Sequence, residues 1–336
     1  MRVVRAQRVI AAALLFFLSA LAAAAQDDPC LRRTVAVSVL DAEGRPVPGL
    51  APQNFHAEVK RRAIPVVSAK LDGAPHRVVV VLDASASMFD GEKQWGLAKS
   101  LAEQALAASP KSFQAGLIVF NDAVRIKIPV QGDPSPARQA FAELPARPDK
   151  RNPATGRHTA LWDALVAASE LLNPGQFGDA IYAVTDGEDN ESRTELKQLR
   201  RTLATRGVRL FSAWFGYEIL NGHPTVEELE VFDFLSMVTE SGGIVAHIPP
   251  TPRWGAPLPK YSQIGVEQLK QVRAEADQIF AAMQFTYRLE IALPATLDKA
   301  EKWKLLVLDS KNQKANAVLA YPMRLEPCAA TSAKAN

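Results

Sequence analysis

The sequence VVVVLDASASMFDG occupies residues 78–91 and places five apolar residues directly before Asp83, Ser85 and Ser87. A short apolar run of this kind is typical of a strand that is buried on both faces of a parallel sheet. Ligands of open parallel sheets bind outside the carboxyl ends of the strands, where the chain leaves for the next helix. The three oxygen-bearing side chains therefore follow a core strand at the edge where a binding site is expected.

From residue 78 to residue 247, apolar runs alternate with amphipathic helical patterns. This alternation predicts an α/β fold, a doubly wound, mostly parallel six-stranded sheet with helices on both faces. The expected strands are 78–82, 114–120, 124–129, 180–185, 209–214 and 243–247. The expected helices are 93–108, 136–143, 160–172, 192–206 and 226–240. Only three residues separate the second and third strands, too few for a crossover helix, so this pair should be an antiparallel hairpin at a sheet edge.

The flanking segments have a different pattern. Residues 34–71 alternate in a way that predicts about three short strands. After a proline-rich linker and a helix at 266–283, three more strands are expected at 285–294, 301–310 and 316–325. We expect these strands to form a small β unit around an inserted α/β domain. The predicted division is a signal peptide at 1–25, an N-terminal β segment at 30–75, the α/β domain at 76–250, and a linker, helix and C-terminal strands at 251–328, the last packing with the N-terminal segment.

The first residues predict export. Three arginines precede an apolar run over residues 9–25 that is broken only by Ser19 and ends in small residues. This is the layout of a secretory signal peptide, with cleavage expected near Ala25. An uncleaved membrane anchor is the alternative, but the run is short and rich in alanine, and no later segment reaches the ~18 apolar residues of a second span. We expect a secreted or periplasmic protein with no stable membrane insertion after cleavage.

The charge balance argues against a nucleic-acid partner. Three of the 39 Lys and Arg residues lie in the leader, and 36 Asp and Glu residues balance the others. General binding to nucleic acids or anionic membranes rests on a basic surface, which a nearly neutral chain does not supply overall.

The two cysteines, Cys30 and Cys328, stand near the two ends of the printed sequence. In an oxidising compartment a disulfide between them is the leading interpretation, since two thiols allow one intramolecular pairing. Two free thiols or an intermolecular bridge are the alternatives. The five histidines are scattered without ligand spacing, which argues against a zinc site.

Two further segments bring oxygen atoms to the same edge of the sheet. Asp186 follows the fourth expected strand in YAVTDGEDN, and Thr159 stands before a helix in RHTALWDAL. The candidate ligand set is Asp83, Ser85, Ser87, Thr159 and Asp186. Hard oxygen ligands suit Mg²⁺, and also Mn²⁺ or Ca²⁺. Two carboxylates leave a divalent ion with bound waters and with room for one more anionic oxygen, which a carboxylate of another protein could supply.

At these residues the sequence resembles the von Willebrand factor type A (VWA) domain, whose metal-ion-dependent adhesion site (MIDAS) is built from D-x-S-x-S, a distant threonine and a distant aspartate. The matching residues are DASAS at 83–87, Thr159 in HTALWDAL and Asp186 in VTDGEDN. The resemblance implies that Ser85, Ser87 and Thr159 contact the metal or hold its waters. It implies that Asp83 and Asp186 act largely through water.

The segment VSVLDAEGRPVPGLAPQNFHAEVKRRAIPV before the motif gives a narrower resemblance. Together with the motif it is similar to the bacterial secreted family described as VWFA-related, over roughly residues 34–325. Many relatives carry glycine where this chain has Ala86, a difference that adds one methyl group near the expected ion.

Each candidate residue also has a structural explanation. In this alternative, Asp83, Ser85 and Ser87 shape a turn without binding a metal, and Thr159 caps a helix. Thr155 is the nearest substitute for Thr159, and Asp189 competes with Asp186 but is expected to shape the turn. A nucleophilic serine is a further alternative, but the sequence has no G-x-S-x-G elbow, and His247 is the only histidine near the end of an expected core strand.

The sequence therefore predicts an exported VWA-domain protein that is not an enzyme. It is expected to bind an Asp or Glu side chain of a protein partner through the metal. A metal-independent interaction scaffold is the second hypothesis, and a metal-assisted hydrolase using Asp83 and Asp186 is the third.

Overall fold

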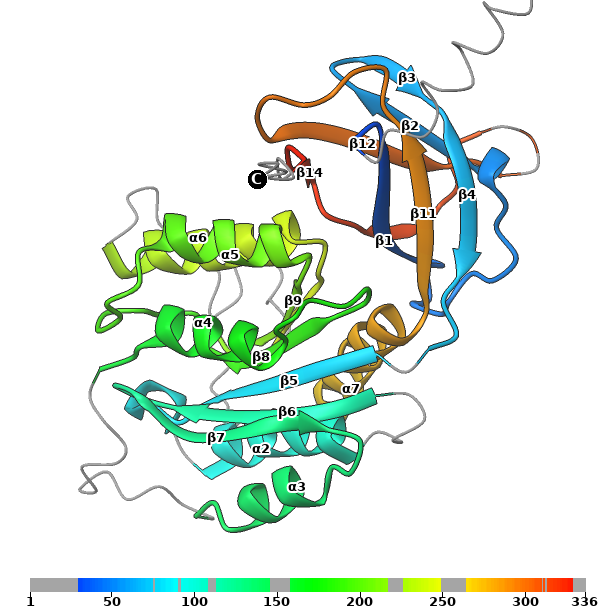
Figure 1. Cartoon of the computed structure of the whole chain (residues 1–336). Helices are drawn as coiled ribbons and strands as arrows, with labels where there is room; N and C mark the ends of the chain where they lie inside the picture. The colour runs from blue at the N-terminus through cyan, green and yellow to red at the C-terminus, as the bar shows by residue number, and fades with distance from the viewer. Residues whose placement is uncertain are drawn as a thin grey trace, which may run out of the picture.

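A computed structural model describes residues 30–74, 76–89, 92–107, 113–145, 158–216, 226–248, 264–309, 311 and 313–328. The expected signal peptide, the expected linker and Thr155 lie outside these residues. Two units are apparent, an α/β unit around a six-stranded sheet and a β unit made from the two ends of the described chain (Figure 1).

The six-stranded sheet has the order β10-β9-β8-β5-β6-β7. Its strands are β5 (His76–Asp83), β6 (Phe113–Phe120), β7 (Val124–Gln131), β8 (Ala180–Thr185), β9 (Arg209–Trp214) and β10 (Val245–His247). β5 pairs in parallel with β6 and β8, whereas β7 pairs with β6 in antiparallel orientation at the edge. The doubly wound, mostly parallel sheet and its edge hairpin are therefore confirmed.

The apolar run of β5 explains its central position. Val78, Val80 and Leu82 pack into the core on one face of the sheet. Val79 and Val81 pack into the core on the other face. Because successive side chains of a strand point to opposite faces, only an uninterrupted apolar run fills both cores.

Helices cover both faces. They are α2 (Glu92–Ala107), α3 (Ser135–Ala142), α4 (Leu161–Leu171), α5 (Leu196–Arg206), α6 (Val226–Glu240) and α7 (Val266–Gln284). Apolar side chains of α2, α3 and α7 join one core, and those of α4, α5 and α6 join the other (Figure 1). The expected start of α5 at Ser192 is wrong, because the four residues before Leu196 are used in a loop that bonds to α4.

The β unit consists of two four-stranded sheets with the orders β13-β1-β11-β4 and β14-β12-β2-β3. Its N-terminal elements are β1 (Arg32–Leu40), the 3-10 turn η1 (Pro52–Asn54), β2 (Phe55–Val59), β3 (Arg62–Ile64) and β4 (Val66–Leu71). Its C-terminal strands are β11 (Thr286–Ala292), β12 (Glu301–Val307), β13 (Val318–Ala320) and β14 (Arg324–Leu325). One core, which includes Val37, Phe55, Leu289 and Trp303, joins the two sheets.

The last expected strand, 316–325, is divided in the structure. β13 pairs with β1 in one sheet, and β14 pairs with β12 in the other. Pro322 stands between them and has no backbone N–H to continue a ladder. The chain therefore changes sheets at this point instead of forming one strand.

The disulfide between Cys30 and Cys328 is present, with 5.3 Å between the two Cα atoms. Cys30 precedes β1 and Cys328 follows β14, so the bond joins ends of the chain that enter different sheets. The predicted pairing is confirmed, and it closes the β unit covalently.

Buried polar contacts join the two units. Arg209 at the start of β9 is buried and donates hydrogen bonds of 2.8 Å to the hydroxyls of Ser38 on β1 and Thr286 on β11. Burial lowers the pKa of Arg209 to about 10. Within the α/β unit, His76 at the start of β5 bonds through Nδ1 to the carbonyl of Met283 in α7, at 2.7 Å. In the described part of the chain, none of the helices has the length and apolar character needed to cross a membrane.

Candidate metal centre

The turn after β5 gathers the first three candidate residues. Asp83 is the last residue of β5 and is fully buried, and its Oδ1 accepts a 2.8 Å hydrogen bond from the backbone N–H of Ser85. The chain then enters the 3-10 turn η2 (Ala86–Phe89), which carries Ser87. The hydroxyl oxygens of Ser85 and Ser87 lie 3.0 Å apart. The D-x-S-x-S segment thus folds back so that its polar side chains lie together.

Asp186 reaches the same place from the neighbouring strand. β8 lies beside β5 in parallel, so the residues after Thr185 leave the sheet next to Asp83. The Thr185 hydroxyl donates a 2.7 Å hydrogen bond to Oδ2 of Asp83 and accepts one from the backbone N–H of Gly187. The hydroxyl of Ser87 lies near the carboxyl group of Asp186 and acts to lower its pKa. Asp83, Ser85, Ser87 and Asp186 therefore belong to one connected polar cluster.

The backbone around Thr159 is fixed by the ends of two other elements. Its N–H donates to Oδ1 of Asn190, and its carbonyl accepts from the N–H of Asn190, at 2.8 and 2.9 Å. The next residue, Ala160, donates its N–H to the carbonyl of Asn121, directly after β6. Thr159 is 2% exposed. The structure thus places Thr159 against the loop that follows Asp186.

Asp189 has a structural role. Its Oδ1 accepts hydrogen bonds from the backbone N–H of Trp162, at 3.0 Å, and from the hydroxyl of Ser192. Asp163 in turn accepts from the backbone N–H groups of Arg193 and Thr194. Asp189 therefore caps the first turn of α4, as expected of a residue that shapes the turn, and these bonds keep the segment before α5 out of a helix.

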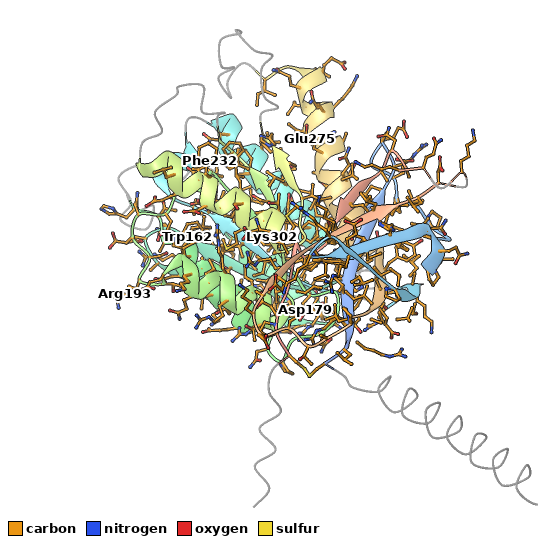
Figure 2. The ribbon with its side chains drawn as sticks, turned by 90° about the horizontal axis from the view of Figure 1, so that it is seen from above. Trp162, Asp179, Arg193, Phe232, Glu275 and Lys302 are labelled. Carbon is orange, nitrogen blue, oxygen red and sulfur yellow. A yellow bond between two sulfur atoms is a disulfide. The ribbon has the colours of Figure 1, made fainter. Side chains whose placement is uncertain are left out.

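These bonds hold the loop after β8 against the first turn of α4, so the two segments that carry Asp186 and Thr159 are joined. Figure 2 shows Trp162 and Arg193, on these two segments, at the opposite end of the α/β unit from Asp179, which directly precedes β8. The candidate site therefore lies at the carboxyl ends of the core strands, as the sequence predicts.

Two residues of the site's surroundings were missed by sequence reasoning. Thr185 bonds Asp83, and the Trp214 indole N–H donates a 2.6 Å hydrogen bond to the backbone carbonyl of Asp186. A hydroxyl at the end of the otherwise apolar run AIYAVT is a signal that could have revealed Thr185. No pattern in the sequence marks Trp214, the last residue of β9.

The two carboxyl groups are held in an environment that disfavours their negative charges. Burial, and secondly the charge of Asp186, raises the pKa of Asp83 to about 8, against the lowering effect of the hydrogen bonds from Thr185 and Ser85. Burial also raises the pKa of Asp186. Within the described ranges, no Lys, Arg or His forms an ion pair with either residue. The cluster therefore has a deficit of positive charge.

The donor set fits a hard divalent cation. It combines two carboxylates with three hydroxyls, which are ligands that Mg²⁺, Mn²⁺ and Ca²⁺ accept. Among the residues that the structure describes, no group of three or more His, Cys, Asp or Glu side chains is arranged to hold a metal, so hydroxyls and waters have to complete the coordination. Asp83 and Ser85 are buried whereas Ser87 is exposed, so the cluster opens to solvent on the Ser87 side.

Residues 78–188 match the von Willebrand factor type A domain family. Similar solved structures include proximal thread matrix protein 1 from the mussel byssus, with a zinc-occupied MIDAS motif, at 14% identity and a TM-score of 0.45, covering 66% of this chain and 50% of that chain. An aerotolerance-related membrane protein from Bacteroides fragilis NCTC 9343 has 16% identity and a TM-score of 0.41, covering 61% and 100%. The conserved hypothetical protein BatB from Bacteroides thetaiotaomicron has 15% identity and a TM-score of 0.38, covering 61% and 100%.

The chain spans about half the length of the mussel protein that it matches. No curated protein matches the chain. The family match begins at the first residue of the apolar run in β5 and ends two residues after Asp186, so it includes all five candidate ligands. This chain therefore contains a von Willebrand factor type A domain over residues 78–188.

Proposed function

We propose that this VWA domain binds a protein partner through a divalent cation, Mg²⁺ or alternatively Mn²⁺ or Ca²⁺. Asp83, Ser85, Ser87, Thr159 and Asp186 hold the cation directly or through water. An Asp or Glu carboxylate of the partner completes its coordination. VWA domains often mediate interactions between proteins, and the metal dependence and the acidic partner are the specific parts of this proposal.

The observation that carries the proposal is the pair of buried carboxyl groups that have no basic ion-pair partner among the described residues. Burying a carboxylate is costly unless a positive charge or several hydrogen bonds compensate for the loss of water. Asp83 receives hydrogen bonds from Ser85 and Thr185, but these do not offset the effects of burial and of Asp186 on its pKa. A divalent cation would remove the repulsion between the two carboxylates, and it would favour their charged forms.

The limited charge of the site supports a role in binding. Two carboxylates balance the charge of a divalent cation, and the remaining protein ligands are neutral hydroxyls that leave it strongly electrophilic. The exposed position of Ser87 gives a partner access from solvent. A carboxylate that enters from another protein would then bind as a charged ligand, whereas an amide or a hydroxyl would bind more weakly.

We propose that the domain is not an enzyme. The hydroxyls of Ser85 and Ser87 hydrogen-bond each other, and Ser87 lies near the carboxyl group of Asp186. Among the hydrogen bonds of the described residues, none joins His247 to either serine, and the His247 ring packs edge-on against Trp214 with 4.9 Å between ring centroids. Turnover of ester or phosphate substrates would favour the hydrolase hypothesis, and partner binding that persists without metal would favour the scaffold hypothesis.

We also propose that the protein is exported to the bacterial periplasm or beyond. The leader pattern of residues 1–25 and the Cys30–Cys328 disulfide support this location, because disulfides persist in oxidising compartments. Its narrower relationship to the VWFA-related bacterial family rests on the resemblance of residues 34–325. Detection of the protein in the periplasmic or culture fraction with its N-terminus near Gln26 would test the export proposal.

Calorimetric titration of Mg²⁺ and Mn²⁺ into metal-stripped residues 26–336 tests the site directly. We expect saturable binding by the wild type and its loss in Asp83→Asn, because this substitution removes one of the two ligand charges. Asp298→Asn removes an exposed charge elsewhere and should bind normally. Circular dichroism spectra would establish that the variants are folded. Absence of binding by the wild type at millimolar ion would refute the metal site.

A further inference from the structure

Two cavities lie where the β unit meets the ends of helices α5 and α6. The first has a volume of about 500 Å³, and its lining includes Trp303, Tyr321 and Met323. The second has a volume of about 390 Å³ and reaches Gly207 and Ser241, directly after α5 and α6. Both volumes fall in the ~300–1,000 Å³ range of ligand sites. Figure 1 shows β14 beside these helix ends.

Glu240 and Arg324 line both cavities, so the cavities adjoin, and we call the two together the basic groove. Its position is remote from the metal centre. Gly207 and Val208 directly precede β9, so this end of the groove lies at the amino end of that strand, whereas Asp83 and Asp186 follow the carboxyl ends of β5 and β8. The basic groove and the metal centre therefore lie at opposite ends of the parallel strands.

Positive charge dominates the groove. Its cationic residues are Lys60, Arg61, Lys197, Arg200, Arg201, Lys302, Lys304 and Arg324. Its acidic residues are Glu58, Glu240 and Glu326. Arg200 is compensated by Asp233 and Glu240, and Lys60 by Glu301. In the described part of the chain, Arg61, Lys302 and Lys304 form no ion pair. A chain that is almost neutral overall thus concentrates cations at one place.

The hairpin turn between β2 and β3 gives an independent indication. Lys60 and Arg61 form its two-residue loop, and both have left-handed backbone conformations, with φ of 50° and 63°. Asn-Gly and Asp-Gly are the favoured residues in such turns, because other residues adopt positive φ at a cost in free energy. The chain instead places two long cations there, and both line the groove. Local conformational cost at a solvent-facing turn points to a function for these side chains.

Apolar surface interrupts the cations. Tyr321, Pro322 and Met323 connect β13 to β14 and line the groove, and Met323 is 43% exposed. The Tyr321 ring packs edge-on against Trp303, at 5.1 Å between centroids, which holds it in place. A ligand that fits this lining carries negative charges with apolar groups between them. A peptide with both acidic and apolar side chains has this chemistry, whereas a polyphosphate chain lacks the apolar groups.

From these observations we infer that the basic groove binds an acidic peptide segment of a protein partner. The cations of the groove run from Lys60 and Arg61 in the β2–β3 turn to Lys197 and Arg201 on α5, so several carboxylates of one segment can meet them in succession. This site is additional to the metal centre and requires no metal ion. A partner that used both sites would gain avidity from the second contact.

Fluorescence anisotropy tests the inference with residues 26–336 in EDTA, which removes the metal-dependent contact. The probe is a fluorescein-labelled peptide in which glutamate alternates with leucine and alanine, and the comparison peptide has glutamine for each glutamate. We expect the glutamate peptide to bind at least tenfold more tightly than the glutamine peptide. Binding should weaken as salt is added, because the contacts are exposed charges.

The decisive variant is Lys60→Asn with Arg61→Gly. It removes two groove cations but supplies the residues that the turn prefers, so its thermal midpoint should equal or exceed that of the wild type. We expect at least a tenfold loss of affinity for the glutamate peptide. The charge-matched control, Lys70→Asn with Arg273→Gln, removes two exposed cations that do not line the groove and should retain binding.

The remaining outcomes are equally specific. Asp83→Asn should bind the probe as the wild type does, so failure of the metal centre leaves this inference intact. Equal loss of affinity in the groove variant and the charge-matched control would overturn it, as would binding of the glutamine peptide with the same affinity. Tenfold tighter binding of inorganic polyphosphate than of the glutamate peptide would overturn the choice of a peptide ligand.

Discussion

Replacement of Asp83 by asparagine should stabilise the metal-free protein at pH 8. The pKa of Asp83 is raised from 3.8 to about 8 in the folded protein, chiefly by burial and secondly by Asp186. The folded state therefore binds more protons than the unfolded state between these two pH values. By linkage, the wild-type free energy of unfolding falls as pH rises through this window. Asparagine carries no charge, so the variant lacks this contribution from residue 83.

The magnitude follows from the size of the pKa change. Each pKa unit corresponds to about 1.4 kcal/mol, so the full effect has an upper limit of about 5 kcal/mol at pH 8. Asparagine keeps an oxygen that can accept from the N–H of Ser85, but its amide group disturbs the hydrogen bond from Thr185, which costs about 1 kcal/mol or more. We expect Asp83→Asn to be about 2–4 kcal/mol more stable than wild type at pH 8 in EDTA.

Urea unfolding at pH 5 and pH 8, each with EDTA or with Mg²⁺, measures these differences. At pH 5 the advantage of the variant should largely disappear, because most wild-type Asp83 is then protonated. Added Mg²⁺ should stabilise only the wild type and reverse the order at pH 8. The reasoning is refuted if, in EDTA, the stability difference between variant and wild type does not change with pH, or if the variant is less stable at pH 8.

Three further predictions test other contacts. Replacement of Cys30 and Cys328 by serine should lower the free energy of unfolding by about 3–5 kcal/mol, because the disulfide closes a very long loop. Urea unfolding of the β unit, compared between the variant and the wild type, measures this difference. Thr185→Val should weaken Mg²⁺ binding by about tenfold in calorimetry, because it removes a bond that orients Asp83, while Thr185→Ser should retain affinity. Burial lowers the pKa of His76, so below about pH 6.5 the folded state binds fewer protons than the unfolded state and loses stability as the pH falls. This loss of stability should be smaller in His76→Gln. Equal losses in thermal melts of the variant and the wild type would contradict the assignment.

The α/β fold was predictable because its strands carry strong local signals. The uninterrupted run from Val78 to Leu82 has no helical periodicity, and it fills two cores at once. The short connection at residues 121–123 leaves only a hairpin as an option. Such signals depend on neighbouring residues alone, so a single sequence is sufficient to read them.

The parts that were missed depend on contacts between distant residues. Ser192 begins an amphipathic pattern, yet the amides that follow it bond to Asp163, which is 30 residues away at the start of α4. Likewise, the division of residues 316–325 depends on pairing with β1 and β12. Buried Arg209 bonds hydroxyls in the other unit, and no local pattern announces this contact.

The same distinction holds within the candidate site. Asp83, Ser85, Ser87 and Asp186 lie at or directly after strand ends that could be placed from the sequence, and the structure brings them into one polar cluster. Thr159 follows residues 146–157, which lie outside the described part, so its placement rests on its bonds to Asn190 and on the position of Ala160.

The connections between the two units have a mechanical consequence. The chain leaves the β unit through β4 and returns to it through β11, and these strands pair with each other, with Leu71 opposite Tyr287. A tensile force applied to the α/β unit by an attached partner would pull on the adjacent ends of both strands. β11 also pairs with β1 along nearly its whole length. Pulling β11 out of the sheet along its own axis therefore has to break the hydrogen bonds of this ladder together instead of one at a time. The Cys30–Cys328 bond ties the N-terminal end of β1 to the segment after β14, so a force carried along β11 reaches a strand that is held covalently.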